Sequence, residues 1–405
     1  MNKSKNTSWY RKRHKVLCTI AKPILKLLVE IEDNFIVEEV KTNDGAALIL
    51  SNHISGFDPI KLGLSISDKV CYYVATDDLF NKKFTGGLLK FSVNPIPKSK
   101  SVSDLKCVKT ILRVLKEGHK VAIFPEGNRT YTGELCHIDD SIAKLVKVAK
   151  VPVYIFNMEG GYSVDPRWSN KKRRNPNYCR LKKIIDVEEI KKSTHKELYN
   201  TIVENLKCSP FDYPLKKNYK HLSEYLERAI YYCPNCDSFE TIYSHKNEVY
   251  CFNCGYELRY NNDLTFSLIK GEKEVKNVVL WDKIQKEKMQ NTDPFISDDV
   301  IFSDNQVTLY EIIKYKGKRA LIKNGLVTIN NKELRVSSKK KEIVIPLSDI
   351  YDSCVVMKHK ASFYVSDYQY QLDGKARFCA LKYVQLYHHI KNIKNGIKED
   401  EFLGL

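Results

Sequence analysis

Between residues 40 and 160 the apolar and polar positions alternate between the two periods of regular secondary structure. Short apolar runs that end in polar residues are typical of buried strands, and apolar residues recurring every three or four positions are typical of helices. Strands are predicted at 45–51, 69–75, 120–124 and 151–157, and helices at 58–66, 103–117 and 140–149. This alternation predicts an α/β domain with a mostly parallel, mixed sheet.

The pattern changes in the second half of the chain. A helix at 194–206, with Thr194 as cap and Glu197 three residues later, is expected to close the first domain. After residue 262 short alternating runs predict hairpins, and a final helix is predicted over Ala376–Ile390, with His388 and His389 on its surface. Strands are predicted at 321–329, 334–336, 343–345, 353–357, 362–365 and 368–372. Hairpins followed by one helix resemble a PH- or GRAM-like domain at the level of the fold.

The N-terminal stretch combines basic and apolar side chains. Eight lysines and arginines precede the first acid, Glu30, and Val16–Leu28 is apolar except for Lys22 and Lys26. This predicts an amphipathic helix, with Pro23 as a candidate kink. Two interpretations stand side by side. The helix is an anchor at an anionic membrane surface, where each basic residue adds about 1 kcal/mol, or it is a packing helix with a solvated basic face.

Four of the twelve cysteines form two Cys-x-x-Cys pairs, Cys233/Cys236 and Cys251/Cys254, with fourteen residues between the pairs. Two knuckles at this separation can place four thiolates tetrahedrally around one Zn²⁺, and Gly255 eases the turn after the second knuckle. Because no further polar group accompanies them, we expect a structural zinc ribbon. The segment between the knuckles carries only Lys246 as a cation, which argues against strong nucleic-acid binding.

Candidate catalytic chemistry follows two of the predicted strands. His53 and Asp58 bracket a turn between the first strand and a helix that begins at Asp58-Pro59, with Asp58 as the predicted N-cap and Gly56 giving backbone freedom. Such a turn can fold the carboxylate back onto the imidazole, which fixes the tautomer and leaves the other ring nitrogen free as a general base. A satisfied structural pair is the alternative.

The second block is Phe124-Pro125-Glu126-Gly127-Asn128-Arg129, which also comes after an apolar strand. The order NHxSxxDP and then FPEGxR resembles the glycerolipid acyltransferases of the lysophosphatidate acyltransferase type, over about residues 40–210. The resemblance implies that His53 is the base and Asp58 its orienter, and that Glu126, Gly127 and Arg129 belong to the acceptor site. Lys98, in Asn94–Lys100, falls where this family usually has an arginine, and lysine binds phosphate without the bidentate fork.

Net charge points to anionic partners. The chain has 67 lysines and arginines against 49 acids, a net charge of +18, which suits nucleic acid or an anionic bilayer. A basic patch is formed in sequence by Arg167, Lys171, Lys172, Arg173, Arg174 and Arg180. It is either a surface for phospholipid or an acidic acyl carrier protein, or a solvated loop.

The other eight cysteines are scattered along the chain, as in proteins of reducing compartments. No signal peptide and no apolar run of about 18 residues is visible. We therefore expect a cytoplasmic protein, peripherally associated with the inner face of the membrane.

The expected organisation is a basic helical region at 1–38, an acyltransferase domain at 39–215, a zinc ribbon at 228–260 and a β-rich PH/GRAM-like domain at 262–395. The resemblance implies a 1-acylglycerol-3-phosphate O-acyltransferase that takes its acyl chain from acyl-CoA or acyl carrier protein and needs no catalytic cofactor. One alternative changes the acceptor to another lysophospholipid or to glycerol 3-phosphate. An alternative of another class is a nucleic-acid-binding zinc-ribbon protein with a degenerate acyltransferase domain.

Overall fold

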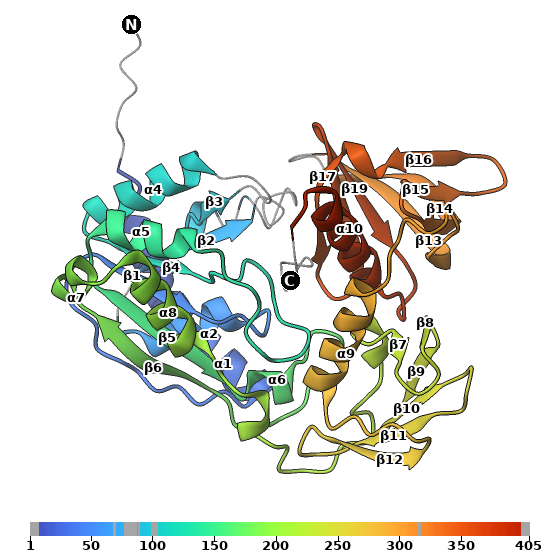
Figure 1. Cartoon of the computed structure of the whole chain (residues 1–405). Helices are drawn as coiled ribbons and strands as arrows, with labels where there is room; N and C mark the ends of the chain where they lie inside the picture. Colours follow the sequence, from blue (N-terminus) through green and yellow to red (C-terminus); the bar gives the residue numbers. More distant parts are fainter. Residues whose placement is uncertain are drawn as a thin grey trace, which may run out of the picture. The chain divides into compact units, whose positions relative to one another are not determined.

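A computed structural model describes residues 8–67, 70–76, 87, 90–98, 104–313 and 317–397 (Figure 1). The chain divides into two compact units. Unit 1 comprises residues 1–130, 134–164 and 174–210, and unit 2 comprises residues 131–133, 165–173 and 211–405. The short segments 131–133 and 165–173 therefore belong to the C-terminal unit although they interrupt the N-terminal one.

Unit 1 is built on a six-stranded sheet with the order β3-β2-β4-β1-β5-β6. The strands are β1 (Ala47–Ser51), β2 (Cys71–Thr76), β3 (Ile96–Lys98), β4 (Lys120–Ile123), β5 (Val153–Glu159) and β6 (Tyr178–Ile185). The first five strands pair in parallel, and β6 pairs antiparallel with β5. The predicted α/β fold with a mostly parallel sheet is confirmed. Strand β3 and the antiparallel edge strand β6 were not predicted.

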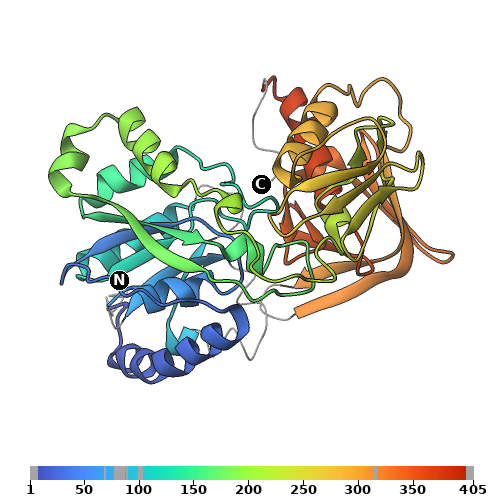
Figure 2. The same ribbon diagram turned by 90° about the horizontal axis from the view of Figure 1, so that it is seen from below.

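Helices cover both faces of this sheet. The helices are α1 (Lys12–Asp33), α2 (Asp58–Ser65), α4 (Leu105–Lys116), α5 (Ser141–Ala149), α6 (Gly161–Val164), α7 (Val187–Lys192) and α8 (His195–Leu206). One continuous core joins alternate residues of β1, β4 and β5 to the inner sides of α4, α5, α7 and α8. Figure 2 shows α1, in dark blue, on the side opposite α7 and α8, in green. The predicted capping box of Thr194 and Glu197 begins α8.

The apolar side of α1 does not face the core. Val16, Ile20, Ile24, Leu27 and Ile31 are each more than half exposed, whereas His14, Val29 and Asp33 are buried. The helix is anchored from its inner side, because Asp33 forms an ion pair of 3.0 Å with Lys61 of α2 and both side chains are almost fully buried. No helix of the described residues combines the length and the hydropathy that a membrane span requires.

Unit 2 begins with small antiparallel sheets around the two cysteine knuckles. β7 (Tyr232–Cys233) pairs with β8 (Ser238–Phe239), and a four-stranded sheet has the order β12-β11-β10-β9. Its strands are β9 (Ile242–His245), β10 (Glu248–Cys251), β11 (Glu257–Tyr260) and β12 (Phe266–Lys270). The backbone of Gly255 has a φ of 71°, in the left-handed region, as predicted for the turn after the second knuckle. Helix α9 (Val278–Gln290), which was not predicted, follows.

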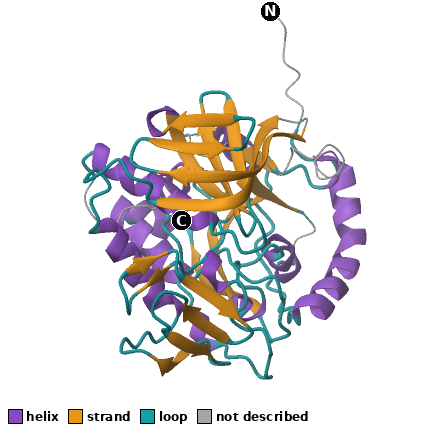
Figure 3. Cartoon of the chain, turned by 90° about the vertical axis from the view of Figure 1, so that its right-hand side faces the viewer, coloured by secondary structure: helices purple, strands orange, loops and turns teal. Residues whose placement is uncertain are grey.

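The remainder of unit 2 is a seven-stranded antiparallel sheet followed by a helix. The strands are β13 (Phe302–Ile313), β14 (Gly317–Ile329), β15 (Glu333–Ser337), β16 (Glu342–Pro346), β17 (Ile350–Val356), β18 (Lys360–Val365) and β19 (Tyr368–Asp373). Their order is β16-β15-β14-β13-β19-β18-β17, and helix α10 (Ala380–Lys394) packs on β17 and β18. These strands are orange in Figure 3. The β-rich region closed by one helix is confirmed.

Two predictions about polar residues of this unit are wrong. His388 and His389 are buried, because every residue of α10 from Ala380 to Ile390 is covered. Their Nε2 atoms lie 3.1 Å from the carbonyl oxygens of Ser353 and Thr292. The basic patch predicted around residue 170 is not one solvated surface either. Arg167 and Arg173 are buried, and Arg167 donates to the carbonyl oxygens of Val355 and Met357.

Candidate functional site

The candidate site lies at the C-terminal edge of the parallel sheet, where open α/β sheets bind their ligands. The chain leaves β1 at Ser51 and turns through His53 into α2. The side chain of Asn52 fixes the start of this turn, since its Oδ1 accepts a hydrogen bond of 2.7 Å from the backbone N–H of Met158 in β5. The ring of His53 stacks on Phe124, which follows β4, with 4.5 Å between the ring centroids. Residues that follow two neighbouring strands are therefore in direct contact.

His53 and Asp58 form the predicted pair. Nδ1 of His53 lies 2.9 Å from Oδ2 of Asp58, and the His53 side chain keeps 20% of its surface exposed while that of Asp58 keeps 1%. Because the carboxylate accepts, Nδ1 carries the proton and Nε2 holds a lone pair. Among the described residues, no group hydrogen-bonds to Nε2. In the neutral ring, Nε2 is therefore the nitrogen that can accept a proton.

The position of Asp58 differs in one respect from the prediction. Phe57, not Asp58, is the N-cap of α2, and Pro59 occupies the first turn as expected. The Asp58 carboxylate reaches backwards instead of capping its own helix. Oδ2 accepts the backbone N–H groups of Ile54 (2.6 Å) and Ser55 (2.8 Å), and Oδ1 accepts the Ser55 hydroxyl (2.6 Å). One buried carboxylate thus holds the whole turn as well as the ring.

The charge state of Asp58 follows from these contacts. Burial alone would raise the pKa of the Asp58 carboxyl. The hydrogen bond and charge of His53, the charge of Lys61 and the Ser55 hydroxyl outweigh burial and hold this pKa below its ordinary value. Asp58 is therefore ionised at neutral pH and can stabilise an imidazolium at His53.

Glu126 joins the two sequence blocks through the backbone. Its Oε1 accepts the N–H of His53 at 2.5 Å, and its Oε2 accepts the N–H of Cys136 at 2.7 Å. The N–H of Thr130 also donates to the carbonyl oxygen of His53, at 3.1 Å. Burial raises the pKa of Glu126 to about 8, although the two backbone donors act in the opposite direction. Both carboxylate oxygens are engaged by the chain itself, so this geometry favours a positioning role over direct contact with a ligand.

Arg129 lies beside the His53 turn. A methyl group added at Gly56 would lie 3.8 Å from a terminal guanidinium nitrogen of Arg129. This is an ordinary van der Waals distance, and Gly56 does not adopt a left-handed conformation, so the backbone freedom predicted for Gly56 is not used here. Gly127 does adopt a positive φ, of 65°, and its N–H closes a turn onto the carbonyl oxygen of Phe124. Arg129 follows that turn, and its guanidinium lies near Gly56 in the turn that carries His53.

Lys98 is not brought to this cluster directly. It ends β3, the edge strand, and is exposed. Strands β2 and β4 lie between β3 and β1, so about 14 Å of sheet separates Lys98 from the end of β1 at the usual strand spacing. It shares the C-terminal edge of the sheet with His53, because β1 to β5 all run parallel.

Three residues that support the site, Asn52, Ser55 and Cys136, were not predicted from the sequence. Asn52 and Ser55 lie within the motif, and their bonds to Met158 and Asp58 hold the turn. Cys136 contributes its backbone N–H and a side-chain hydrogen bond to Glu126, and an isolated cysteine ten residues after Glu126 gives no recognisable pattern in the sequence. Asn52 and Ser55 could have been suspected, since short polar side chains next to a turn commonly bond to it.

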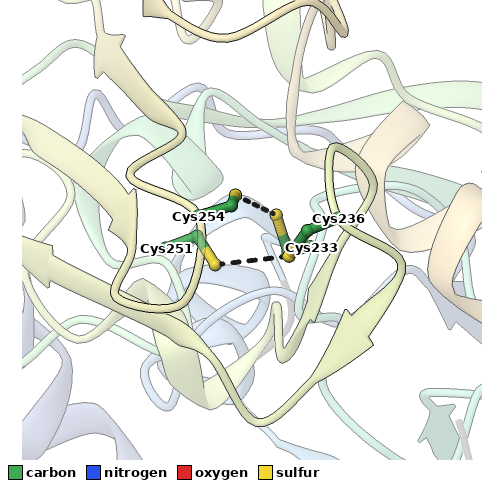
Figure 4. Close-up of side chains that lie close together, drawn as sticks. All are labelled: Cys233, Cys236, Cys251 and Cys254. Atoms are coloured by element: carbon green, nitrogen blue, oxygen red, sulfur yellow. Dashed lines mark hydrogen bonds between the residues drawn. The ribbon is translucent and has the colours of Figure 1, made fainter.

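The four predicted metal ligands converge in unit 2. The sulfurs of Cys233, Cys236, Cys251 and Cys254 all lie within 4.8 Å of one another and point towards a common centre (Figure 4). The Sγ atoms of Cys233 and Cys254 are 3.8 Å apart, and those of Cys236 and Cys251 are 3.7 Å apart. A tetrahedral Zn²⁺ with Zn–S bonds of about 2.3 Å requires sulfur separations of about 3.8 Å. The geometry therefore fits a metal ion held by four thiolates.

Asparagines in the knuckles support the thiolates. Nδ2 of Asn235 lies 3.6 Å from the sulfur of Cys254, and Nδ2 of Asn253 lies 3.6 Å from the sulfur of Cys236. Each knuckle thus donates a hydrogen bond to a cysteine of the other one. Donors of this kind orient ligands and offset their negative charge. Within the residues that the structure describes, no further His, Cys, Asp or Glu joins the four thiolates, which is the ligand set of a structural site.

Comparison with known proteins agrees with the site geometry. Residues 30–158 match the family described as Acyltransferase. Over 87 residues the chain is 34% identical to the 1-acyl-sn-glycerol-3-phosphate acyltransferase of Bacillus subtilis (strain 168), a match that covers 22% of this chain and 43% of that protein. The chain thus spans less than half the length of this curated relative.

Among solved structures, the 1-acyl-sn-glycerophosphate (LPA) acyltransferase PlsC from Thermotoga maritima matches with a TM-score of 0.39 and 19% identity, over 48% of this chain and 76% of that one. The family match contains His53, Asp58 and the Glu126–Arg129 block. The similarity to the acyltransferase family thus covers residues 30–158, about a third of the chain.

Proposed function

We propose that the protein is a 1-acylglycerol-3-phosphate O-acyltransferase, which transfers an acyl chain from a thioester donor to lysophosphatidate and releases phosphatidate and a thiol. The observation that carries this proposal is the 2.9 Å contact between His53 and the buried Asp58, beside the guanidinium of Arg129. A general base next to an anion-binding group suits an acceptor that carries both a hydroxyl and a phosphate.

The chemistry can be followed atom by atom. Nε2 of His53 takes the proton of the acceptor hydroxyl while the hydroxyl oxygen attacks the thioester carbonyl carbon. Asp58 stabilises the imidazolium that forms. As the tetrahedral intermediate collapses, the carbon–sulfur bond breaks and the imidazolium returns the proton to the leaving thiolate. General acid–base catalysis of this kind contributes about 10²–10⁴-fold, and no residue in this scheme requires a metal.

The remaining site residues position these groups. Glu126 holds the His53 backbone, and Gly127 makes the turn that leads to Arg129. Arg129 binds the acceptor phosphate and aims its hydroxyl at Nε2, an effect of orientation. Lys98, at the same edge of the sheet, adds positive charge for a phosphate group further along this edge.

We also propose that α1 holds unit 1 at the cytoplasmic, inner face of the membrane. Its exposed aliphatic residues recur at intervals of four, four, three and four positions, which places them on one side of the helix. Exposed Lys12, Lys15 and Lys26 follow one border of that stripe, and Lys26 lies 3.8 Å from Glu30. Lys22 does not join them, because its ammonium donates to the carbonyl oxygen of Ile66. An exposed apolar stripe with cations along one border favours an interfacial helix.

For the cysteine cluster we propose a structural Zn²⁺. The four thiolates would hold the ion, and the ion would supply the cross-link between the two knuckles. Lys246 remains the only cation between the knuckles, which disfavours the nucleic-acid alternative. A different acceptor, such as another lysophospholipid or glycerol 3-phosphate, would use the same base and the same phosphate-binding group.

An acceptor panel tests the proposed function. The full-length protein is given a labelled acyl thioester with lysophosphatidate, other lysophospholipids or glycerol 3-phosphate, on anionic vesicles, and the products are separated. We expect phosphatidate from lysophosphatidate, with a KM for this acceptor that rises in Arg129→Ala. Transfer to every acceptor but lysophosphatidate, or an unchanged KM in the variant, would contradict the assignment.

A further inference from the structure

Helix α4 of unit 1 carries an exposed basic stripe that the catalytic scheme does not use. Lys106, Lys109 and Lys116 are exposed, and Arg113 is half-buried between them. Their spacing of three, four and three residues places them on one side of the helix. The opposite side is buried in the core. Its buried residues are Cys107, Ile111, Val114 and Leu115.

No acidic side chain neutralises these three lysines within the part of the chain that the structure describes. The two acids at the ends of α4 are engaged elsewhere. Asp104 caps the helix by accepting the N–H of Cys107, and Glu117 accepts hydrogen bonds from Ser8 and Trp9. Arg113 lies 3.7 Å from Glu117, so the uncompensated charge resides on the lysines.

Many other basic side chains of unit 1 are already paired. Lys61 bonds to Asp33, Arg180 to Glu38 and Lys183 to Glu189. The stripe is also bordered by two aliphatic side chains, Leu105 at 69% exposure and Val108 at 37%. Unpaired cations beside exposed aliphatic groups are the combination expected of a surface that receives an acidic partner.

The stripe begins at the edge of the sheet that holds the candidate active site. β3 ends at Lys98 and α4 begins at Leu105, while β4 starts at Lys120 on the opposite edge. Because β3 and β4 run parallel, α4 must start at the C-terminal edge and run back. Helix α4 packs on β3 and β4. Phe124, the residue that follows β4, stacks on the ring of His53.

We propose that the basic stripe of α4 docks an acidic acyl carrier protein, which presents the acyl thioester on its flexible arm to the edge of the sheet where His53 lies. This inference rests on the proposed function and specifies its donor. From Lys106 to Lys116 the stripe is about 15 Å long at 1.5 Å per residue, which suits an acidic helix of a protein more than a single nucleotide.

The exposed side chains of α4 also differ from those expected of a membrane anchor. Helix α1 exposes five aliphatic residues by more than half, whereas α4 presents mainly ammonium groups with only Leu105 exposed to that degree. Electrostatic complementarity of this kind sets association rate and partner choice, and it weakens with salt because the Debye length is about 10 Å at 0.1 M.

The test reverses charge on the stripe in the full-length protein. Lys106→Glu/Lys109→Glu is compared with Lys339→Glu/Lys340→Glu, a matched control with the same change in net charge at exposed positions of unit 2. Each protein is assayed with palmitoyl-acyl carrier protein and with palmitoyl-CoA, and direct binding to the carrier protein is measured at low and high salt.

We expect the α4 variant to raise the KM for the carrier-protein donor about tenfold or more at low salt, with kcat retained. The KM for palmitoyl-CoA should stay within about twofold, and the control should behave as the wild type. Loss of carrier binding in the α4 variant alone would support the proposal independently of turnover.

The proposal is overturned by an unchanged KM for the carrier donor, by an equal rise for both donors, or by weaker vesicle binding without a change in carrier binding. The last of these would make α4 a membrane surface. Transfer from palmitoyl-CoA alone in the wild type would reject this inference and leave the proposed function standing. If neither donor is used, both fail.

Discussion

Replacing Asp58 with asparagine separates the charge of this residue from its role in holding the turn. Oδ2 accepts three N–H groups, those of His53, Ile54 and Ser55, and Oδ1 accepts a hydroxyl. An asparagine amide can keep its oxygen at the position of Oδ2. Its NH₂ group then meets the Ser55 hydroxyl, which can rotate to accept. The turn and the His53 tautomer should both survive, because two backbone donors orient the amide.

What Asp58→Asn removes is the negative charge beside the imidazolium. Two unit charges about 4 Å apart interact by about 4 kcal/mol at an effective dielectric constant of about 20. His53 is 20% exposed, so solvent screening reduces this figure to about 2–4 kcal/mol. At about 1.4 kcal/mol per factor of ten, we expect kcat to fall about 30- to 1000-fold.

The assay is the steady-state rate of acyl transfer, accompanied by thermal unfolding of each variant. Asp58→Ala is the comparison, since it also leaves the N–H groups of Ile54 and Ser55 without an acceptor, at a cost of about 1–3 kcal/mol each. The reasoning is refuted if Asp58→Asn retains kcat within about threefold, or if it unfolds as readily as Asp58→Ala.

Three further predictions follow from particular contacts. Because the pKa of Glu126 is raised to about 8, the folded chain holds a proton that the unfolded chain releases. The free energy of unfolding of the wild type should therefore fall relative to that of Glu126→Gln as the pH rises from about 5 to 8. Urea denaturation that shows the same difference between the two proteins at every pH would contradict this. Chelation, or Cys251→Ser, should lower the unfolding temperature of unit 2 as a whole, because Lys382 of α10 forms ion pairs with both Glu240 beside the knuckles and Asp304 of β13. Cys208→Ser is the control for this variant, and calorimetry showing no shift would reject the role. Ile20→Ser/Ile24→Ser should weaken binding to anionic vesicles about tenfold or more, since each buried aliphatic side chain is worth about 1.5 kcal/mol or more; equal sedimentation with vesicles would argue against α1 as the anchor.

The sequence was most informative where a local pattern determines the structure. The apolar runs of the first domain and the capping box of α8 needed only neighbouring residues to be recognised. The same holds for His53 and Asp58, because the six residues 52–57 between strand and helix form a short turn that keeps the two side chains close together. The contact is therefore as expected, while the catalytic roles of both residues stay predictions. The domain limits drawn from composition also stay predictions.

The contacts that the sequence could not reveal are long-range and often involve backbone groups. Glu126 accepts hydrogen bonds from the N–H groups of His53 and Cys136. Because every residue except proline has a backbone N–H, the residue types do not reveal such donors. Helix α10 is covered on all sides, so amphipathic spacing misplaced its two histidines. Helix α9 buries Asp282 and Gln285, so its inner side is partly polar and does not give the apolar periodicity by which a helix is predicted. Arg167 and Arg173 are buried by carbonyl groups that are distant in sequence.

The most direct test of the account is the formation of phosphatidate by purified wild-type protein and by His53→Ala, with labelled lysophosphatidate and an acyl thioester on anionic vesicles. The ring of His53 is stacked on Phe124 at the surface and takes no part in the core cluster of the sheet, so the variant should fold. We expect the wild type to form phosphatidate and the folded variant to lose at least about a hundredfold in rate. A His53→Ala protein that acylates lysophosphatidate at the wild-type rate would contradict the central claim.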